Sequence, residues 1–218
     1  MFGYIESFFR QFDYAALLDA ATRALAVLVC LTVHETCHGL AALALGDPTA
    51  KQMHRLSMNP LRHIDWLGLL SMFLLGFGWA KPVPVDPRYF KHPKQGMALT
   101  ALAGPVSNFV LAFLCILLVR GAAEMTAGGG VLFWVVSFLL TTAILSIGLG
   151  LFNLVPIPPL DGSKVLFSIL PERAYSFLLR YERYGMLLLF AVIFLDIGGD
   201  FLTRAIQTVY YFMVELVF

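Results

Sequence analysis

Long apolar segments constrain this chain more than any other feature of its sequence. Residues 15–45, 97–119 and 131–152 are each long enough, at about 1.5 Å per helical residue, to cross a hydrocarbon core about 30 Å thick. A fourth apolar segment, 184–197, is shorter and would have to tilt. Hydrophobic residues make up 59% of the 218 and charged residues only 13%, whereas about a quarter of the residues in soluble domains are charged. The chain is therefore predicted to be an integral membrane protein.

The segments between these helices predict the rest of the fold. Residues 66–80 are apolar but short, which favours a re-entrant segment over a span. The next stretch begins "KPVPV" and has no helical period, so it is predicted to be extended. The predicted fold class is an all-α polytopic membrane protein with four to six membrane helices and a re-entrant or β-strand-like segment near 66–90. Residues 1–218 are predicted to form one domain, because the length leaves no room for a separate soluble module.

Basic residues predict the orientation of the chain in the membrane. Residues 47–96 contain seven of them: Lys51, Arg55, Arg62, Lys81, Arg88, Lys91 and Lys94. The turn at 120–130 contains only Arg120. Because cytoplasmic loops are enriched in Lys and Arg, the 47–96 side is predicted to be cytoplasmic. The net charge of +1 gives no indication of a nucleic-acid partner.

The first apolar helix contains a polar motif, "LTVHETCHGL" at residues 31–40. His34 and His38 are four residues apart and project from the same helical face, so both can bind one zinc ion, with Glu35 beside the metal-bound water. On a soluble helix this pattern is often just a solvated face. Inside an apolar helix the same residues cost several kcal/mol unless they have a function. The motif therefore predicts the chemistry of a zinc metalloprotease.

A catalytic zinc ion needs a third protein ligand and one open position. Asp161 is the leading candidate, because it follows the proline-broken stretch "NLVPIPPLDG" between two apolar segments. Non-helical backbone at membrane depth is tolerated only where protein or a water-filled cavity surrounds it. Two alternatives remain at this point. Asp161 could simply cap the short helix predicted at 161–170, and a histidine of the polar loops, His54, His63 or His92, could be the ligand instead.

Four stretches together carry a family resemblance: "HETCH", "GWAKPVPVDPRYF", "ALAGPVSN" and "NLVPIPPLDG". The chain resembles the site-2 protease family of intramembrane zinc metalloproteases from about residue 15 to 185. It resembles the compact bacterial or archaeal form of that family, without a PDZ or CBS domain. Two separated motifs in the right order are far more specific than the histidine motif alone.

The resemblance implies roles for particular residues. His34, His38 and Asp161 would bind one zinc ion per chain, and Glu35 would be catalytic. Asn108 and Asn153 would lie near the substrate or the active-site backbone. Asparagines in membrane helices also serve as interhelical hydrogen-bonding residues, which is the structural alternative for both.

The implied function is hydrolysis of peptide bonds in or near transmembrane segments. The partners would be a transmembrane protein or peptide substrate and the lipid bilayer. An unwound substrate could pair with a strand edge formed by Lys81, Pro82 and Val83, although each proline removes a donor. The protein would lie in the cell membrane with its active site about 12 Å inside the cytoplasmic end of the first helix.

Two other functions also place polar residues in a bilayer. A metal-binding membrane transporter often shows internal repeats, which this sequence lacks, and would leave Glu35 without a role. A protease-dead membrane scaffold would have little need of an intact Glu35. Both alternatives are less well supported than the protease.

Overall fold

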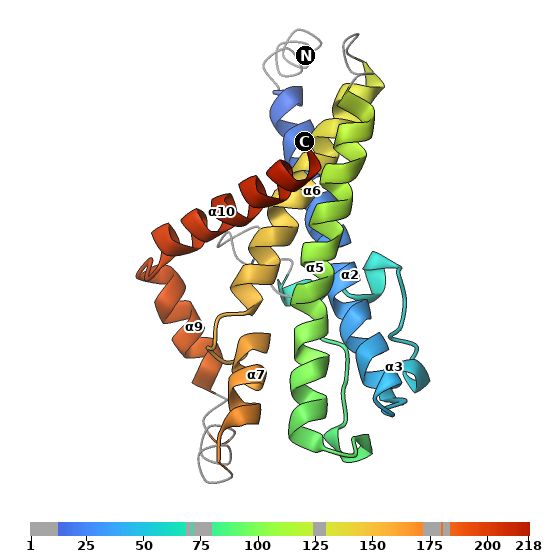
Figure 1. The fold of residues 1–218 in the computed structure, drawn as a ribbon, viewed down its shortest axis with the longest axis vertical. Helices are drawn as coiled ribbons and strands as arrows, with labels where there is room; N and C mark the ends of the chain where they lie inside the picture. The colour runs from blue at the N-terminus through green and yellow to red at the C-terminus, as the bar shows by residue number, and fades with distance from the viewer. Residues whose placement is uncertain (1–12, 69–70, 72–79, 124–129, 172–179, 181–183) are drawn as a thin grey trace, which may run out of the picture.

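The computed structural model describes residues 13–68, 71, 80–123, 130–171, 180 and 184–218, and most of these are helical (Figure 1). The elements in chain order are α2 (Tyr14–Ala44), α3 (Thr49–Gln52), η1 (Pro60–Arg62), η2 (Pro87–Tyr89), α5 (Pro93–Ala123), α6 (Val131–Asn153), α7 (Asp161–Ile169), α9 (Gly185–Phe194) and α10 (Gly199–Val217). Most of the segment 66–80, predicted to be re-entrant, lies outside the described residues.

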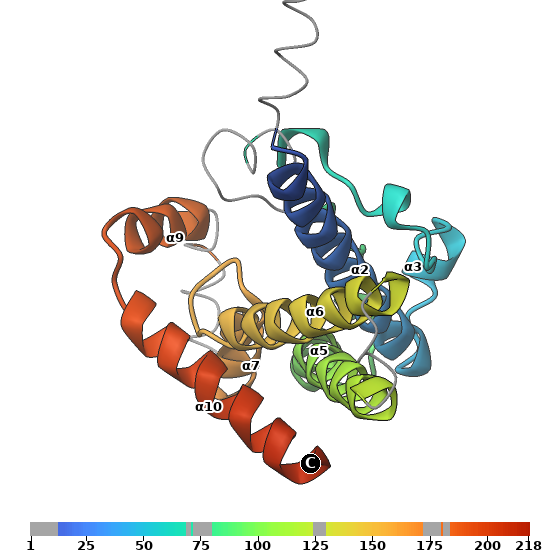
Figure 2. The same ribbon diagram turned by 90° about the horizontal axis from the view of Figure 1, so that it is seen from above.

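Three long helices, α2, α5 and α6, form the central bundle (Figure 1). Seen from above, α9 and α10 lie on one side of this bundle and α3 lies on the other (Figure 2). Small residues are buried in all three helices, including Ala26 and Ala42 of α2, Ala101 and Ala112 of α5, and Gly150 of α6. Lipid tails are as apolar as leucine, so membrane helices associate through close packing of small residues. Ile116 and Ile147 fill the core between α5 and α6.

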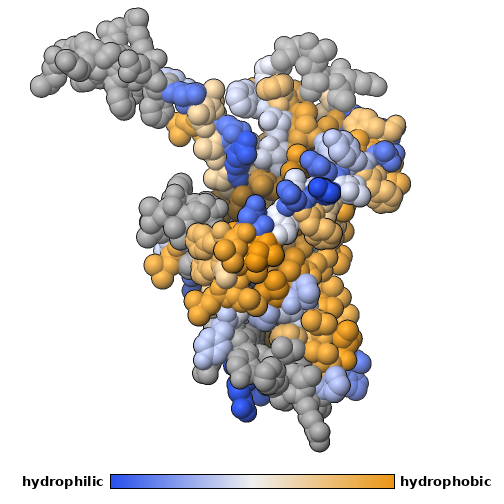
Figure 3. All heavy atoms as spheres, turned by 90° about the vertical axis from the view of Figure 1, so that its left-hand side faces the viewer, coloured by the Kyte–Doolittle hydropathy of each residue, from blue (hydrophilic) through white to orange (hydrophobic). Residues whose placement is uncertain are grey.

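Three helices are long and apolar enough to cross a membrane: α2, α5 and α6. A fourth candidate is the pair α9 and α10, which is bent by 87° at a short break. The face that carries this pair shows hydrophobic atoms over much of its middle (Figure 3). The all-α polytopic prediction is confirmed, and the described residues contain three candidate spans, or four with the bent pair, against the four to six predicted.

The connection from α2 to α5 contains little regular structure. Gly46 has a φ of +106°, which favours glycine, and it ends α2 by turning the chain into Asp47. An isolated antiparallel bridge joins Ile64 to Ala80. Residues 81–86 follow outside any helix or paired strand of the described structure, so where a strand-like segment was predicted the described residues show one bridge and an irregular segment.

The connection from α6 to α7 is the proline-rich break. Helix α6 ends at Asn153, and α7 begins at Asp161, beside α5 (Figure 1). Gly162 explains why this join is so tight, because a Cβ at that position would lie 2.1 Å from the carbonyl oxygen of Leu154. Only glycine allows the first turn of α7 to pack directly against the end of the break.

The helix ends allow the predicted orientation to be tested. Gly121, at the exposed end of α5, and Lys91, just before its other end, should lie on opposite sides of the membrane. Because the basic residues gather on the Lys91 side, a cysteine at Lys91 should react with an impermeant maleimide only from the cytoplasmic side, and one at Gly121 only from outside. Labelling of sealed vesicles in both orientations measures this, with the unmodified chain as background. The reverse labelling pattern would show that the Lys91 end of the bundle lies on the outer side of the membrane.

Candidate metal centre

Three ligand atoms converge inside the bundle. The Nε2 atoms of His34 and His38 lie 2.9 Å apart, and each lies 3.1 Å from Oδ2 of Asp161. All three residues are buried, with 3%, 8% and 6% of their surfaces exposed. These three were predicted from two motifs more than 120 residues apart, and the structure brings them together.

Two local features of the backbone place these side chains. In α2 the buried residues Cys30, His34 and His38 recur every four positions, so they share the face directed into the bundle. Asp161 is the first residue of α7, and the N-cap position is occupied by Leu160. The alternative that Asp161 merely caps α7 is therefore wrong, because the carboxylate faces the two histidines instead.

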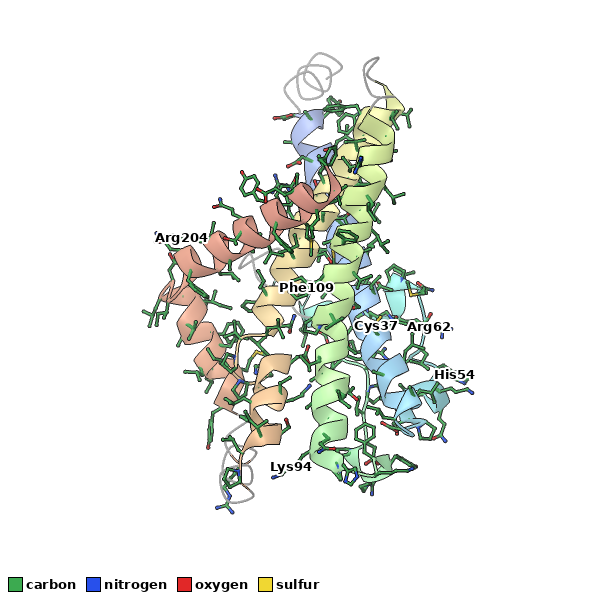
Figure 4. The ribbon with its side chains drawn as sticks, in the orientation of Figure 1. Cys37, His54, Arg62, Lys94, Phe109 and Arg204 are labelled. Atoms are coloured by element: carbon green, nitrogen blue, oxygen red, sulfur yellow. The ribbon has the colours of Figure 1, made fainter. Side chains whose placement is uncertain are left out.

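The loop histidines, the other candidates for the third ligand, lie elsewhere. His54 is exposed beside α3, on the side of the bundle away from α7 (Figure 4). His63 is buried, but its Nε2 bonds to the carbonyl oxygen of Ser57. His92 is exposed just before α5. Among the described residues, the three-ligand cluster consists of His34, His38 and Asp161 alone.

A hydrogen bond fixes the tautomer of His38. Its Nδ1 lies 2.7 Å from the backbone carbonyl oxygen of Thr100, and a carbonyl can only accept. Nδ1 must therefore carry the proton, which leaves the lone pair of Nε2 directed at the cluster. Metal-binding histidines are typically oriented in this way by a partner on the second ring nitrogen.

A lysine accompanies the buried ligand carboxylate of Asp161. The Nζ atom of Lys164 lies 3.5 Å from Oδ1, the carboxylate oxygen that faces away from the histidines. Each oxygen of Asp161 therefore has a separate partner, and Oδ2 is the one presented to the cluster.

The arrangement suits a tetrahedral metal ion. Ligand bonds of 2.0–2.1 Å imply about 3.3 Å between adjacent donor atoms, and the observed separations of 2.9 to 3.1 Å are close to this. The donor set points the same way, because a carboxylate oxygen and a histidine lone pair cannot satisfy each other without a cation or a shared proton. Two imidazole nitrogens and a carboxylate oxygen are also the ligand types that zinc takes in catalytic sites.

The cluster opens into a cavity of about 320 Å³. Its lining residues are His34, Glu35, His38, Pro82, Val83, Val85, Met97, Thr100, Ala101, Asn153, Pro159, Asp161 and Lys164. Glu35 reaches the cavity from the same helix as the two histidines, and its Oε2 accepts a hydrogen bond from the backbone N–H of Val83 at 2.9 Å. A carboxylate, a three-ligand metal site and open space therefore share one chamber.

The residues predicted to bind substrate divide into two groups. Asn153, Pro82 and Val83 line the cavity. Lys81 is exposed, and its N–H bonds to the carbonyl oxygen of His63. Asn108 is fully buried and does not line the cavity, while its backbone carbonyl accepts a bond from Ser146 of α6. Its side-chain amide is also buried and makes no hydrogen bond in the structure, so neither a substrate contact nor an interhelical side-chain bond is seen, and both roles stay predictions.

Comparisons with known proteins agree with this geometry. A family model described as peptidase family M50 matches residues 121–195. The relative "Putative zinc metalloprotease YwhC" of Bacillus subtilis (strain 168) is 37% identical over 179 residues, which are 80% of this chain and 80% of that protein.

The chain belongs to peptidase family M50.

Two further relatives of this M50 chain match less of their own length. "Putative zinc metalloprotease Rip2" of Mycolicibacterium smegmatis is 29% identical over 74% of the chain and 62% of that protein. "Zinc metalloprotease MJ0392" of Methanocaldococcus jannaschii is 33% identical over 40% of the chain and 24% of that protein. No solved structure gives a significant match. Membership of this family confirms the predicted resemblance to site-2 proteases. It also confirms the predicted enzyme class, a zinc metalloprotease, and zinc as the cofactor. The transporter alternative is therefore no longer supported.

Thr100, Gly104 and Lys164 are among the residues of the M50 site for which the sequence predicted no role. Thr100 acts through its backbone carbonyl, which no side-chain pattern reveals. Gly104 lies in "ALAGPVSN", where a role was predicted only for the asparagine, and Lys164 lies in "DGSK", which begins with the aspartate. A basic residue one turn after a ligand carboxylate was the one available signal.

Gly104 provides a test of how closely α5 packs on the metal ligands. A Cβ there would lie 2.5 Å from Nε2 of His38 and 2.6 Å from Cε1 of His34. The Gly104→Ala protein should therefore bind zinc at least about tenfold more weakly, as metal sites do when the groups that orient their ligands are disturbed. Gly148→Ala in α6 is the matched control, because its Cβ would meet only Ile206, at an ordinary 3.4 Å. Equal zinc retention by the two variants in competition with a chelator would contradict the close packing.

Proposed function

We propose that this M50 chain cleaves peptide bonds in or near the transmembrane segments of other membrane proteins, with His34, His38 and Asp161 holding zinc and Glu35 transferring protons. The observation that carries the proposal is the joint opening of the ligand cluster and Glu35 into one cavity within a bundle of apolar helices. Residues 1–218 are proposed to act as a single protease domain. The natural substrate class is therefore one that reaches the cavity from the membrane.

The chemistry divides between the metal and Glu35. When bound, zinc lowers the pKa of a coordinated water to about 7 and polarises a carbonyl group, so a nucleophile is available at neutral pH. Glu35 can accept the proton of the attacking water and later return it to the leaving amine. One of its carboxylate oxygens is bound by the Val83 N–H, which fixes the side chain while the other oxygen remains for this transfer.

Asn153 and Lys164 supply the polar groups on the α7 side of the cavity. The amide nitrogen of Asn153 donates to the carbonyl oxygen of Leu149, so its side-chain oxygen is oriented by its own helix. The Lys164 ammonium adds a positive charge where a substrate carbonyl would be polarised. These placements support the proposed substrate-binding role of Asn153 and leave the pairing role of Lys81 without a cavity contact.

The site lies close to one end of the bundle. His38 precedes the end of α2 at Ala44 by six residues, or about 9 Å. The loops at that end carry the basic residues, so we place the active site on the cytoplasmic side of a multi-pass protein in the cell membrane. Water can therefore reach the cavity by a short path.

Substitution of two residues separates metal binding from catalysis. Glu35→Gln should retain zinc but lose proteolysis by about 10²- to 10⁴-fold, the usual contribution of a general acid–base group. Asp161→Ala should lose both, because it removes a ligand from a three-ligand site. Zinc analysis and cleavage of a model membrane substrate measure the two effects. Full proteolysis by Glu35→Gln would reject the proposed role of Glu35, and an unmodified protein that binds zinc without any proteolysis would favour the scaffold alternative.

Cleavage should also depend on local unwinding of the substrate. A peptide bond inside a helix has its amide and carbonyl occupied, so an extended segment presents its carbonyl carbon more openly. Gly or Pro placed in the cytoplasmic half of a model substrate should speed cleavage, since each destabilises a helix by about 1 to 3 kcal/mol. The same residues placed in the outer half are the control. Turnover that is equal at both depths would contradict the unwinding step and leave the zinc assignment intact.

A further inference from the structure

We propose that the backbone N–H of Val83 positions the catalytic carboxylate of Glu35, and that Asp47 and Arg55 are positioning residues that hold the 81–86 segment in place for this purpose. The inference rests on the proposed function, because it assigns the 81–86 segment a role in the same reaction. It differs from the role predicted for Val83, which was to pair with substrate.

The contact joins two parts of the chain that are far apart in sequence. The nitrogen of Val83 lies 2.9 Å from Oε2 of Glu35, across 48 residues. A hydrogen bond to an ionised carboxylate is about twice as strong as one between neutral groups. Val83 is 8% exposed, so water competes little for this bond.

The local sequence leaves a single donor at this point. Pro82 and Pro84 flank Val83, and proline has no N–H. The N–H of Lys81 is already bonded to the carbonyl oxygen of His63, at 2.9 Å. Within residues 81–84, Val83 therefore has the one N–H that is free to bind Glu35. The fixed φ angles of the two prolines also restrict the backbone on both sides of it.

Polar contacts fasten the segment near both of its ends. The Nη2 atom of Arg55 donates to the carbonyl oxygens of Lys81 and Pro82, at 2.8 and 3.3 Å. At the other end, Oδ2 of Asp47 accepts from the N–H of Asp86 at 2.8 Å. Asp47 is fully buried, and its Oδ1 accepts from the N–H and hydroxyl of Thr49. Because both oxygens of this buried carboxylate are bonded, Asp47 holds the Asp86 end of the segment in a fixed position.

Helix α2 is shaped to receive Val83. Gly39 lies one turn after Glu35 on the same face of the helix. A Cβ on Gly39 would lie 3.1 Å from Cγ1 of Val83 and 2.4 Å from Cδ2 of Leu56. The absence of that Cβ lets the Val83 side chain lie directly against α2, which brings its N–H over Glu35.

This arrangement separates the two roles that Val83 could have. A substrate strand that paired with the Val83 N–H would take it from Glu35 and release the carboxylate at the moment it is needed. A positioning role makes the N–H important for the chemical step, so its loss lowers kcat. A pairing role makes it important for substrate binding, so its loss raises KM with kcat retained.

The experiment compares Val83→Pro with Val83→Ala in the full chain loaded with zinc. Both variants remove the branched side chain of Val83, and the proline variant also replaces the N–H with a ring carbon. We expect the kcat of Val83→Pro to fall about 10- to 100-fold below that of Val83→Ala, with similar KM and equal zinc content. Equal kcat values would overturn the proposal. A higher KM with unchanged kcat would also overturn it, in favour of substrate pairing.

Two further measurements keep the proposal open to test if Val83→Pro fails to fold. Arg55→Met should lower kcat and leave KM nearly unchanged. The substitution removes the hydrogen bonds to the carbonyl oxygens of Lys81 and Pro82 but keeps the Val83 N–H. Hydrogen exchange at the Val83 amide should speed up at least about tenfold in Glu35→Ala, since its acceptor is gone. Unchanged exchange would show that the contact does not exist. This last measurement needs no proteolysis, so it distinguishes failure of the inference from failure of the proposed function.

Discussion

The rest of the structure depends on the convergence of three buried polar side chains on one point. His34, His38 and Asp161 would each be costly alone inside an apolar bundle, and their ligand atoms lie within 3.1 Å of one another, close enough to share one cation. To keep them there, α5 must pack so closely on α2 that only a glycine fits at position 104. The first turn of α7 must pack equally closely on the end of α6, which requires Gly162. The contacts that assemble the metal site are therefore the same contacts that assemble the fold.

The proline break between α6 and α7 follows from the need to deliver a carboxylate to the interior. A continuous helix would carry Asp161 past the histidines, whereas the break lets α7 start beside α5 with its first residue facing them. The non-proline N–H groups of the break donate to nearby carbonyl oxygens, but its backbone is not helical, and non-helical backbone at membrane depth is tolerated where protein covers it. Here α9 provides such cover, because its first residue, Gly185, approaches Pro158 so closely that a Cβ would lie 2.5 Å from the proline ring. The break is therefore covered by α9 at Pro158, whereas Leu154, Pro156 and Pro159 remain exposed.

Sequence reasoning reached the parts of this site that depend on local geometry. The spacing of His34 and His38 is a helical property, and the apolar runs around them fix which helices exist, so both were predictable. The prediction of Asp161 as a ligand depended on two distant motifs occurring in the right order. The alternative ligands His54, His63 and His92 were excluded only by the structure, which places them outside the cluster. The two asparagines looked alike in sequence, yet Asn153 lines the cavity and Asn108 is buried against α6. Which way a helical side chain faces depends on how the helices are rotated in the bundle, and weak amphipathicity in membrane helices gives little indication of that rotation.

The metal-binding residues and the proposed proton-transfer residue of α2 lie on different faces of the helix. Consecutive residues are turned by about 100°, so His34 and Glu35 cannot face the same neighbour. The histidines face α5 and α7, whose close packing makes the metal side rigid. Glu35 faces the 81–86 segment, which is attached through polar contacts from Arg55 and Asp47 and has no partner strand in the described structure. Under the proposed function, an unwound substrate would enter between these two sides to meet both the metal and the carboxylate. The metal ligands lie on closely packed helices, where a Cβ at position 104 would already clash with both histidines. Any adjustment to the substrate would therefore fall to the 81–86 segment, whose prolines restrict its backbone and keep the Glu35 carboxylate directed at the cavity.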